Sequence, residues 1–390
     1  MTESRKLNLF AWAIFFYLVM TIFHKAFVAV GMLLFIVLAF FTSKDSYRAV
    51  LKDKKLIFYI SMIIFFVLSL LITGEGRWNK IKYYLPLIPI VASFYEFGPK
   101  ISDKWIKRLL FWFLTLAAIS SIVGSLTVIF DYNIFKMKVD ISGRNKGAFL
   151  GIMYYSYINA LICIISTSLL FHFKKFKKYV DLKLLIITLI INLVGLYFTY
   201  TRGAILAFTA GLPFIFYYTN KKTFYSLLLA GFILLSWVLY LIFGNHNYSF
   251  YRFKANSLNE SARIVMFKAA VIMYTKKPIT GYGFQNYNKP CIKIQDEYDI
   301  TPKFCHYHSH NQYLEMFGTT GTFGGVAFLL FFGSWLLTYL LGYRDIYLFS
   351  LPGLVTFLAI CMTDTPFYFG AICSIIFTLF AMMFVKERAN

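Results

Sequence analysis

The sequence predicts an all-α integral membrane protein with about twelve transmembrane helices and one large loop between the ninth and tenth of them. Of its 390 residues, 59% are apolar and only 14% are charged, whereas an ordinary soluble domain carries roughly 25% charged residues. Apolar stretches that approach the roughly 20 residues needed to cross a bilayer recur along almost the whole chain. Only residues 244–321 leave room for a domain outside the membrane.

The apolar segments divide the chain into three parts: spans one to nine in residues 1–243, the loop domain with short helices in 244–321, and spans ten to twelve in 322–390. The division of residues 182–219 and of 346–385 into two crossings each stays open. In order, the predicted crossings are 8–23, 26–42, 56–73, 81–97, 108–130, 148–172, 182–200, 203–219, 223–243, 322–341, 346–363 and 366–385.

The net charge of +22 does not indicate a nucleic-acid-binding protein, because the basic residues are dispersed between apolar segments. Cytoplasmic loops of membrane proteins collect Lys and Arg, and alternate loops of this chain do so. With the N-terminus inside, the inner loops include Lys44 to Lys55, Lys100 to Arg108 and Lys174 to Lys183. The outer loops hold fewer basic residues, so both termini are expected inside and the 244–321 loop outside. The first apolar stretch lacks a small-residue cleavage site, which predicts an uncleaved signal anchor.

The five cysteines agree with this topology. Cys163, Cys361 and Cys373 lie within apolar segments, where a free cysteine acts as a small apolar side chain. Cys291 and Cys305 both fall in the outer loop, in a compartment that permits disulfides. A bond between them and a pair of free thiols both remain open, and no zinc-type spacing is present.

Within the loop, residues 261–276 predict a helix with Ser261 as its N-cap. A turn-forming stretch follows at 278–284, and the cluster His306, His308 and His310 then leads into Asn311 and Glu315. Three interpretations of the cluster stay open. Alternating histidines can bind a metal, one neutral imidazole can act as a general base with Glu315 orienting it, or the segment is simply a polar loop.

Three arginines are candidate anion-binding residues on the same outer side. Arg202 lies between two apolar segments, where a charge is costly and indicates function unless it merely anchors a helix end. Arg263 is expected in the first turn of the loop helix, against the helix dipole, unless it is only a solvated surface charge. Arg144 lies with Lys146 in a third outer segment. Converging guanidinium groups match the oxygens of a diphosphate.

The nucleotide-binding, metalloprotease and serine-hydrolase motifs GxxxxGK[ST], GxGxxG, HExxH and GxSxG are absent from a suitable context. Chemistry driven by a nucleotide is therefore unsupported, and an activated substrate must bring its own leaving group. A lipid-linked diphosphate sugar does so.

Four motifs in order resemble the O-antigen ligase and O-antigen polymerase superfamily of bacterial inner-membrane glycan enzymes. They are Thr-Arg-Gly at 201–203, Ala-Arg at 262–263, Pro-x-x-Gly-x-Gly at 278–283 and His-Ser-His-Asn-x-x-Leu-Glu at 308–315. The twelve-span plan with a late periplasmic loop agrees too. The resemblance implies a metal-independent, inverting glycosyltransferase without a cofactor, with its active site facing the periplasm.

Residue by residue, the resemblance implies that His310 is the general base, and that Arg202 and Arg263 bind the donor diphosphate. Arg144, His308 and Asn311 are further substrate-binding candidates, whereas His306 is not part of the pattern. The implied partners are an undecaprenyl-diphosphate-linked glycan donor and a lipid A-core acceptor, joined by an O-antigen ligase in lipopolysaccharide assembly. The alternatives are an O-antigen polymerase, a protein O-oligosaccharyltransferase or a lipid-linked glycan transporter. A transporter is disfavoured because the unusual charges gather at one edge instead of the midplane.

Overall fold

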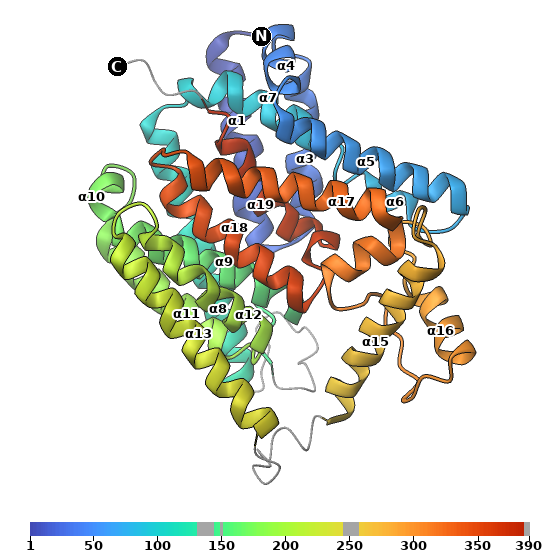
Figure 1. Cartoon of the computed structure of the whole chain (residues 1–390). Helices are drawn as coiled ribbons and strands as arrows, with labels where there is room; N and C mark the ends of the chain where they lie inside the picture. Colours follow the sequence, from blue (N-terminus) through green and yellow to red (C-terminus); the bar gives the residue numbers. More distant parts are fainter. Residues whose placement is uncertain (131–143, 149–150, 245–256, 386–390) are drawn as a thin grey trace.

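The computed structural model describes residues 1–130, 144–148, 151–244 and 257–385. Of residues 234–244 and 257–261 it describes the backbone alone. All regular structure in these residues is helical (Figure 1). The predicted all-α class is therefore confirmed. In the N-terminal half the elements are α1 (Glu3–Ile14), η1 (Phe15–Val19), α2 (Met20–Phe23), α3 (Phe27–Ala39), α4 (Lys44–Leu51), α5 (Lys54–Thr73), α6 (Trp78–Ile81), α7 (Leu87–Phe97), η2 (Gly98–Lys100), α8 (Asp103–Phe130), α9 (Ile152–Phe171) and α10 (Phe173–Phe176).

The C-terminal half is also helical, and every predicted crossing overlaps one or more of the helical elements. The elements are α11 (Leu182–Tyr197), α12 (Arg202–Gly211), η3 (Leu212–Phe216), α13 (Lys221–Gly244), α15 (Ser257–Lys276), α16 (Asn288–Glu297), α17 (Gln312–Leu341), α18 (Tyr347–Thr363), η4 (Pro366–Tyr368) and α19 (Gly370–Met382).

The number of crossings is less settled than the helices themselves. Five helical segments of the described residues are long and apolar enough to span a membrane, or six if the pair α3 and α4, bent by 113°, counts as one. Four more apolar helices have only 10–17 residues, and they fall in the regions 182–219 and 346–385, whose division the sequence left open. The chain is a multi-pass membrane protein, and the count of twelve stays a prediction.

One end of the bundle carries the N-terminus and the loops that the sequence analysis placed inside. We call it the terminal end. Lys100 pairs with Glu3 at 2.8 Å, Lys178 with Asp103 at 3.5 Å, and Lys175 with Asp345 at 2.6 Å. These exposed pairs add little stability, but they show that loops far apart in the sequence return to the same end.

The opposite end, which we call the loop end, brings together the segments that were placed outside. The Arg77 amide donates to the carbonyl oxygen of Phe284 at 3.0 Å, and the Tyr84 hydroxyl donates to that of Phe367 at 2.7 Å. The Asn311 side-chain amide donates to the Met362 carbonyl oxygen at 3.2 Å. Segments far apart in the sequence therefore meet at this end as well.

The segment from α15 to α16 packs as a small unit of its own beside α17 (Figure 1). Its apolar core is separate from the main one and joins α15 to α16 through Met266, Ala269, Ala270, Met273, Tyr287, Cys291 and Ile294. Cys291 and Cys305 form a disulfide, so the first of the two alternatives for these residues holds.

The helix expected from Ser261 begins at Ser257. Arg263 consequently lies in its second turn, and the argument from an opposed helix dipole is wrong.

The turn after α15 is wedged between α5 and α17, which explains the glycine in this motif. Gly281 has φ +63°, and a Cβ on it would lie 2.5 Å from the Thr319 carbonyl oxygen. The Ser69 hydroxyl of α5 contacts the carbonyl oxygens of both Thr280, at 2.8 Å, and Thr319, at 3.0 Å. A second glycine, Gly321, has φ +70° and interrupts α17 next to this contact. The tenth crossing predicted from the sequence, 322–341, begins directly after this interruption, whereas α17 itself begins ten residues earlier, at Gln312.

Replacing Gly281 with alanine is expected to destabilise the chain by more than the roughly 1–2 kcal/mol of a left-handed non-glycine residue, because the new Cβ meets the Thr319 backbone. Gly74→Ala is the matched control, since Gly74 has φ +67° but nothing within 4 Å of an added Cβ. Thermal unfolding in detergent should give a larger fall in Tm for Gly281→Ala. Equal losses in the two variants would show that the close packing contributes nothing.

Candidate active site

The three histidines lie on a short loop that is fastened at both ends. On one side the loop follows Cys305, which is bonded to Cys291 of α16. On the other side Asn311 caps α17, where its side-chain oxygen accepts from the Leu314 amide at 3.0 Å. Both polar atoms of Asn311 are engaged within the protein, because its amide nitrogen donates to Met362. The Asn311 side chain therefore ties the loop to α17 and to the end of α18.

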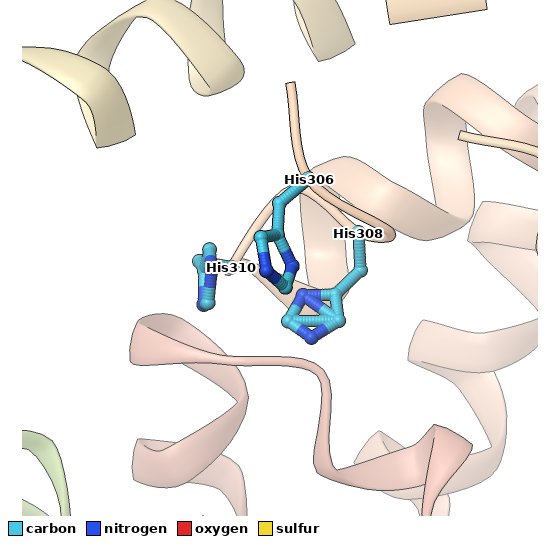
Figure 2. Close-up of side chains that lie close together, drawn as sticks. All are labelled: His306, His308 and His310. Carbon is cyan, nitrogen blue, oxygen red and sulfur yellow. The ribbon is translucent and has the colours of Figure 1, made fainter. Parts of the chain in front are cut away.

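The imidazole rings of His306, His308 and His310 gather on one side of this loop (Figure 2). One ring nitrogen from each lies within 4.8 Å of the other two. The ring centres of His308 and His310 are 4.4 Å apart. His306 is exposed, whereas the side chains of His308 and His310 retain only 14% and 16% of their accessible surface.

A buried carboxylate that the sequence analysis missed lies behind two of these rings. Asp364, between α18 and η4, is fully buried, and its Oδ1 lies 3.3 Å from His310 Nδ1 and 3.7 Å from His308 Nε2. The Tyr157 hydroxyl donates to Oδ2 at 2.7 Å, and the Thr365 amide donates to Oδ1 at 2.8 Å. Asp364 is the only acidic residue between Asp345 and Glu387. An isolated charge in an apolar stretch was the signal that could have found it.

Burial and nearby charges determine the protonation states of the histidines and of Asp364. Burial lowers the pKa of His308 to about 4, although the Asp364 carboxylate opposes that shift. Burial also lowers the pKa of His306, and the nearby His310 adds to that shift. For Asp364, burial raises the pKa, but the neighbouring His310 and His308 and the Tyr157 hydrogen bond together hold it below its usual value. Near neutral pH, His306 and His308 are therefore neutral and Asp364 is ionised.

Glu315 does not orient a histidine, so that part of the sequence interpretation is wrong. Its carboxylate is fully buried and turns toward the loop backbone, where it accepts from the Ser309 amide at 2.7 Å. The Tyr368 hydroxyl donates to its other oxygen at 3.3 Å. Because Glu315 is one helical turn beyond Asn311, its side chain reaches back over the start of α17, as a capping carboxylate does. It fixes the path of the chain between His308 and His310.

Replacing Glu315 with alanine is expected to cost about 1–3 kcal/mol of stability, since it leaves the buried Ser309 amide without an acceptor. Glu315→Gln should recover part of that loss through its side-chain carbonyl oxygen. Thermal unfolding in detergent measures the effect. Glu297→Ala is the control, because Glu297 is exposed and pairs with Lys276 at the surface. If Glu315→Ala unfolds at the wild-type temperature, Glu315 does not hold the loop.

Two of the predicted arginines, Arg144 and Arg263, lie near the Tyr157 hydroxyl that contacts Asp364. The Arg144 side chain donates from Nε to the Thr199 carbonyl oxygen at 2.8 Å and from Nη2 to the Thr201 hydroxyl at 2.6 Å. It is therefore held against the residue that precedes Arg202. The guanidinium groups of Arg144 and Arg263 are both near enough to act electrostatically on the Tyr157 hydroxyl, which contacts Asp364.

Arg202 is exposed at the first position of α12. The start of this helix lies against the end of α18, because a Cβ on Gly203 would come within 2.7 Å of Thr363 Oγ1. Thr363 directly precedes Asp364. The structure thus brings α12, the 144–148 segment and the histidine loop to one place at the loop end.

A second basic group lies on another flank of the loop. The Arg77 guanidinium lies 5.8 Å from the centre of the Tyr307 ring, and its charge acts on His308. Burial lowers the pKa of Lys80, and the positive charges of Arg77, Lys82 and Lys25 add to that shift. These cations therefore crowd together at the loop end.

The arrangement combines a proton acceptor with anion-binding groups at the end of a membrane-spanning bundle. A neutral histidine with a buried carboxylate behind it can take a proton and stabilise the resulting cation. Arginines around it can neutralise phosphate oxygens. These features are typical of a membrane enzyme that acts on an anionic substrate, and three nearby imidazoles can also bind a metal.

Comparison with known families agrees with the resemblance found in the sequence. Residues 184–329 match the family model described as O-antigen ligase, which supports the resemblance of the chain to the O-antigen ligase superfamily. The matched stretch contains Arg202, Arg263 and the histidine loop, whereas Arg144 and Asp364 lie outside it. The family implies a lipid-linked glycan donor and a lipid-anchored acceptor. No curated protein matches the chain.

Proposed function

We propose that this protein is an O-antigen ligase, which transfers O-antigen glycan from undecaprenyl diphosphate to lipid A-core in the bacterial inner membrane. The observation that carries the proposal is the 3.3 Å contact between His310 Nδ1 and the buried Asp364 carboxylate, at the end of the bundle where the arginines gather. The disulfide supports a periplasmic position for this end, because such bonds persist in oxidising compartments.

In the proposed reaction, His310 accepts the proton of an acceptor hydroxyl as the hydroxyl oxygen bonds to the anomeric carbon of the donor. The bond from that carbon to the diphosphate oxygen breaks, and its electron pair leaves with undecaprenyl diphosphate. A single displacement of this kind inverts the anomeric carbon and needs no metal. Asp364 stabilises the imidazolium form of His310. The negative charge of the leaving diphosphate is stabilised by Arg202, Arg263 and Arg144.

The twelve-crossing topology is part of the same proposal. Both termini then lie in the cytoplasm, with the transmembrane parts in 1–243 and 322–390 and the periplasmic domain in 244–321. Two lipid-anchored substrates can meet at the loop end without leaving the outer leaflet. His308 is proposed to contact the acceptor beside His310, since its ring lies closest to that of the proposed base.

The product distinguishes a ligase from a polymerase of the same superfamily. In a strain whose only copy carries Arg202→Ala, we expect lipopolysaccharide without O-antigen and an accumulation of lipid-linked polymer. A polymerase would instead leave cores carrying a single repeat unit. Arg48→Ala is the matched control, because Arg48 is an exposed arginine of α4 at the terminal end (Figure 1). Unchanged O-antigen in the Arg202 variant would contradict its role.

A further inference from the structure

The proposed reaction uses His310 and gives no task to His306, although His306 lies in the same cluster. One nitrogen from each of the three imidazoles lies within 4.8 Å of the others. In a tetrahedral zinc site with Zn–N bonds of 2.0–2.1 Å, such nitrogens are about 3.3 Å apart. Rotation of the exposed His306 side chain and small adjustments of the other two would close the difference.

The two inner histidines have nitrogen atoms available for a ligand. The Nδ1 atom of His308 is buried and has no hydrogen-bond partner within the part of the chain that the structure describes. In His310 the Nδ1 atom faces the Asp364 carboxylate, so Nε2 is the atom left to bind a metal. A buried polar atom without a partner is costly. A metal bound by these rings would occupy lone pairs that the protein leaves unused.

The surroundings also favour a cation. Histidine ligands commonly have a carboxylate behind them, which orients the ring and increases its basicity. Asp364 lies 3.3 Å from His310 and 3.7 Å from His308 and is therefore placed for this role. The Arg77 charge acts against a cation here, but Arg77 is exposed, so its effect is screened more strongly than that of the buried carboxylate.

We propose that His306, His308 and His310 bind one divalent cation of the zinc type, and that the bound cation switches off glycan transfer. The ligand set selects the class of metal, because imidazole suits zinc, copper and nickel whereas magnesium and calcium prefer oxygen ligands. The cation inhibits because it coordinates His310, which can then no longer accept the acceptor proton. The inhibition rests on the proposed function, whereas the binding does not.

Binding is tested on the full chain, purified in detergent and freed of metal with a chelator. Titration with Zn²⁺ against a chromophoric chelator should show one equivalent bound. His306→Ala should weaken that affinity by at least about tenfold, since even partners outside the coordination shell change metal affinity by 10–100-fold. His24→Ala is the matched control at the same end of the bundle. Absence of stoichiometric binding, or equal binding by His306→Ala and the wild type, overturns the proposal.

Inhibition is tested with the same variants in a transfer assay with extracted donor and acceptor lipids. Without metal, His306→Ala should transfer glycan at the wild-type rate. With added Zn²⁺ the wild type should lose activity, and the concentration for half-inhibition should rise at least about tenfold in His306→Ala. Activation by zinc, or equal inhibition of both proteins, overturns the switch.

The two proposals fail in different ways. If Zn²⁺ binds through His306 but His310→Ala still transfers glycan, the metal site stands and His310 is not the base. If zinc neither binds nor inhibits while His310→Ala is inactive, the general base stands and the metal site is wrong.

Discussion

Replacing His310 with alanine is expected to lower the rate of glycan transfer by about 10²–10⁴-fold, the usual contribution of a positioned general base. The acceptor hydroxyl then has no group to take its proton as it attacks. The donor diphosphate should still bind, because its proposed contacts are arginines on other elements. Initial rates with purified chain and extracted lipids would therefore show a fall in kcat with little change in the KM for the donor.

His24→Ala is the control, since it removes a histidine at the same end of the bundle without touching the loop. The control should keep the wild-type rate. A His310→Ala protein that folds, binds donor and transfers glycan at more than a tenth of the wild-type rate would contradict the assignment of His310 as the base.

Replacing Asp364 with asparagine is expected to lower kcat by about 10²–10⁴-fold as well, because an amide cannot stabilise the imidazolium as a carboxylate does. Asparagine keeps the shape of the side chain. Its oxygen can accept from the Thr365 amide, and its NH2 group can donate to the Tyr157 hydroxyl oxygen. The fold should therefore survive. Asp364 acts through His310, so the KM values for both lipid substrates should stay near those of the wild type while kcat falls.

Asp345→Asn is the matched control, since Asp345 is an exposed aspartate of the terminal end that pairs with Lys175. It should behave as the wild type in both assays. A Tm for Asp364→Asn far below that of the wild type would show that Asp364 mainly stabilises the fold. Full activity would remove Asp364 from the reaction altogether.

Much of the fold could be predicted because every segment that crosses the bilayer must be a long run of mostly apolar residues. Runs of apolar residues mark the helices, and the alternation of basic loops agrees with the observed grouping at two ends. The sequence could not settle regions such as 182–219, where helices of 10–17 residues are too short for length alone to distinguish one crossing from two. The early start of α15 at Ser257 was missed because its first turn, Ser-Leu-Asn-Glu, is polar.

The site was predictable as far as local motifs extend. His308 and His310 form a conspicuous motif, and Arg202 stands out as a charge between two apolar segments. Asp364 was missed because its partners lie 54 and 207 positions away in the sequence, at His310 and Tyr157. Glu315 was assigned to the wrong partner since spacing along a helix cannot tell whether a carboxylate faces an imidazole or a backbone amide.

The disulfide that fastens the histidine loop links the proposed activity to the oxidising machinery of the cell envelope. The loop begins at Cys305, one residue before His306, so a newly inserted chain with reduced thiols lacks one of its two fastenings. A cell deprived of its thiol oxidase would then carry a normal amount of this protein in its membrane and display fewer long glycans on its surface. Maturation after insertion would thus govern surface coating without any change in gene expression.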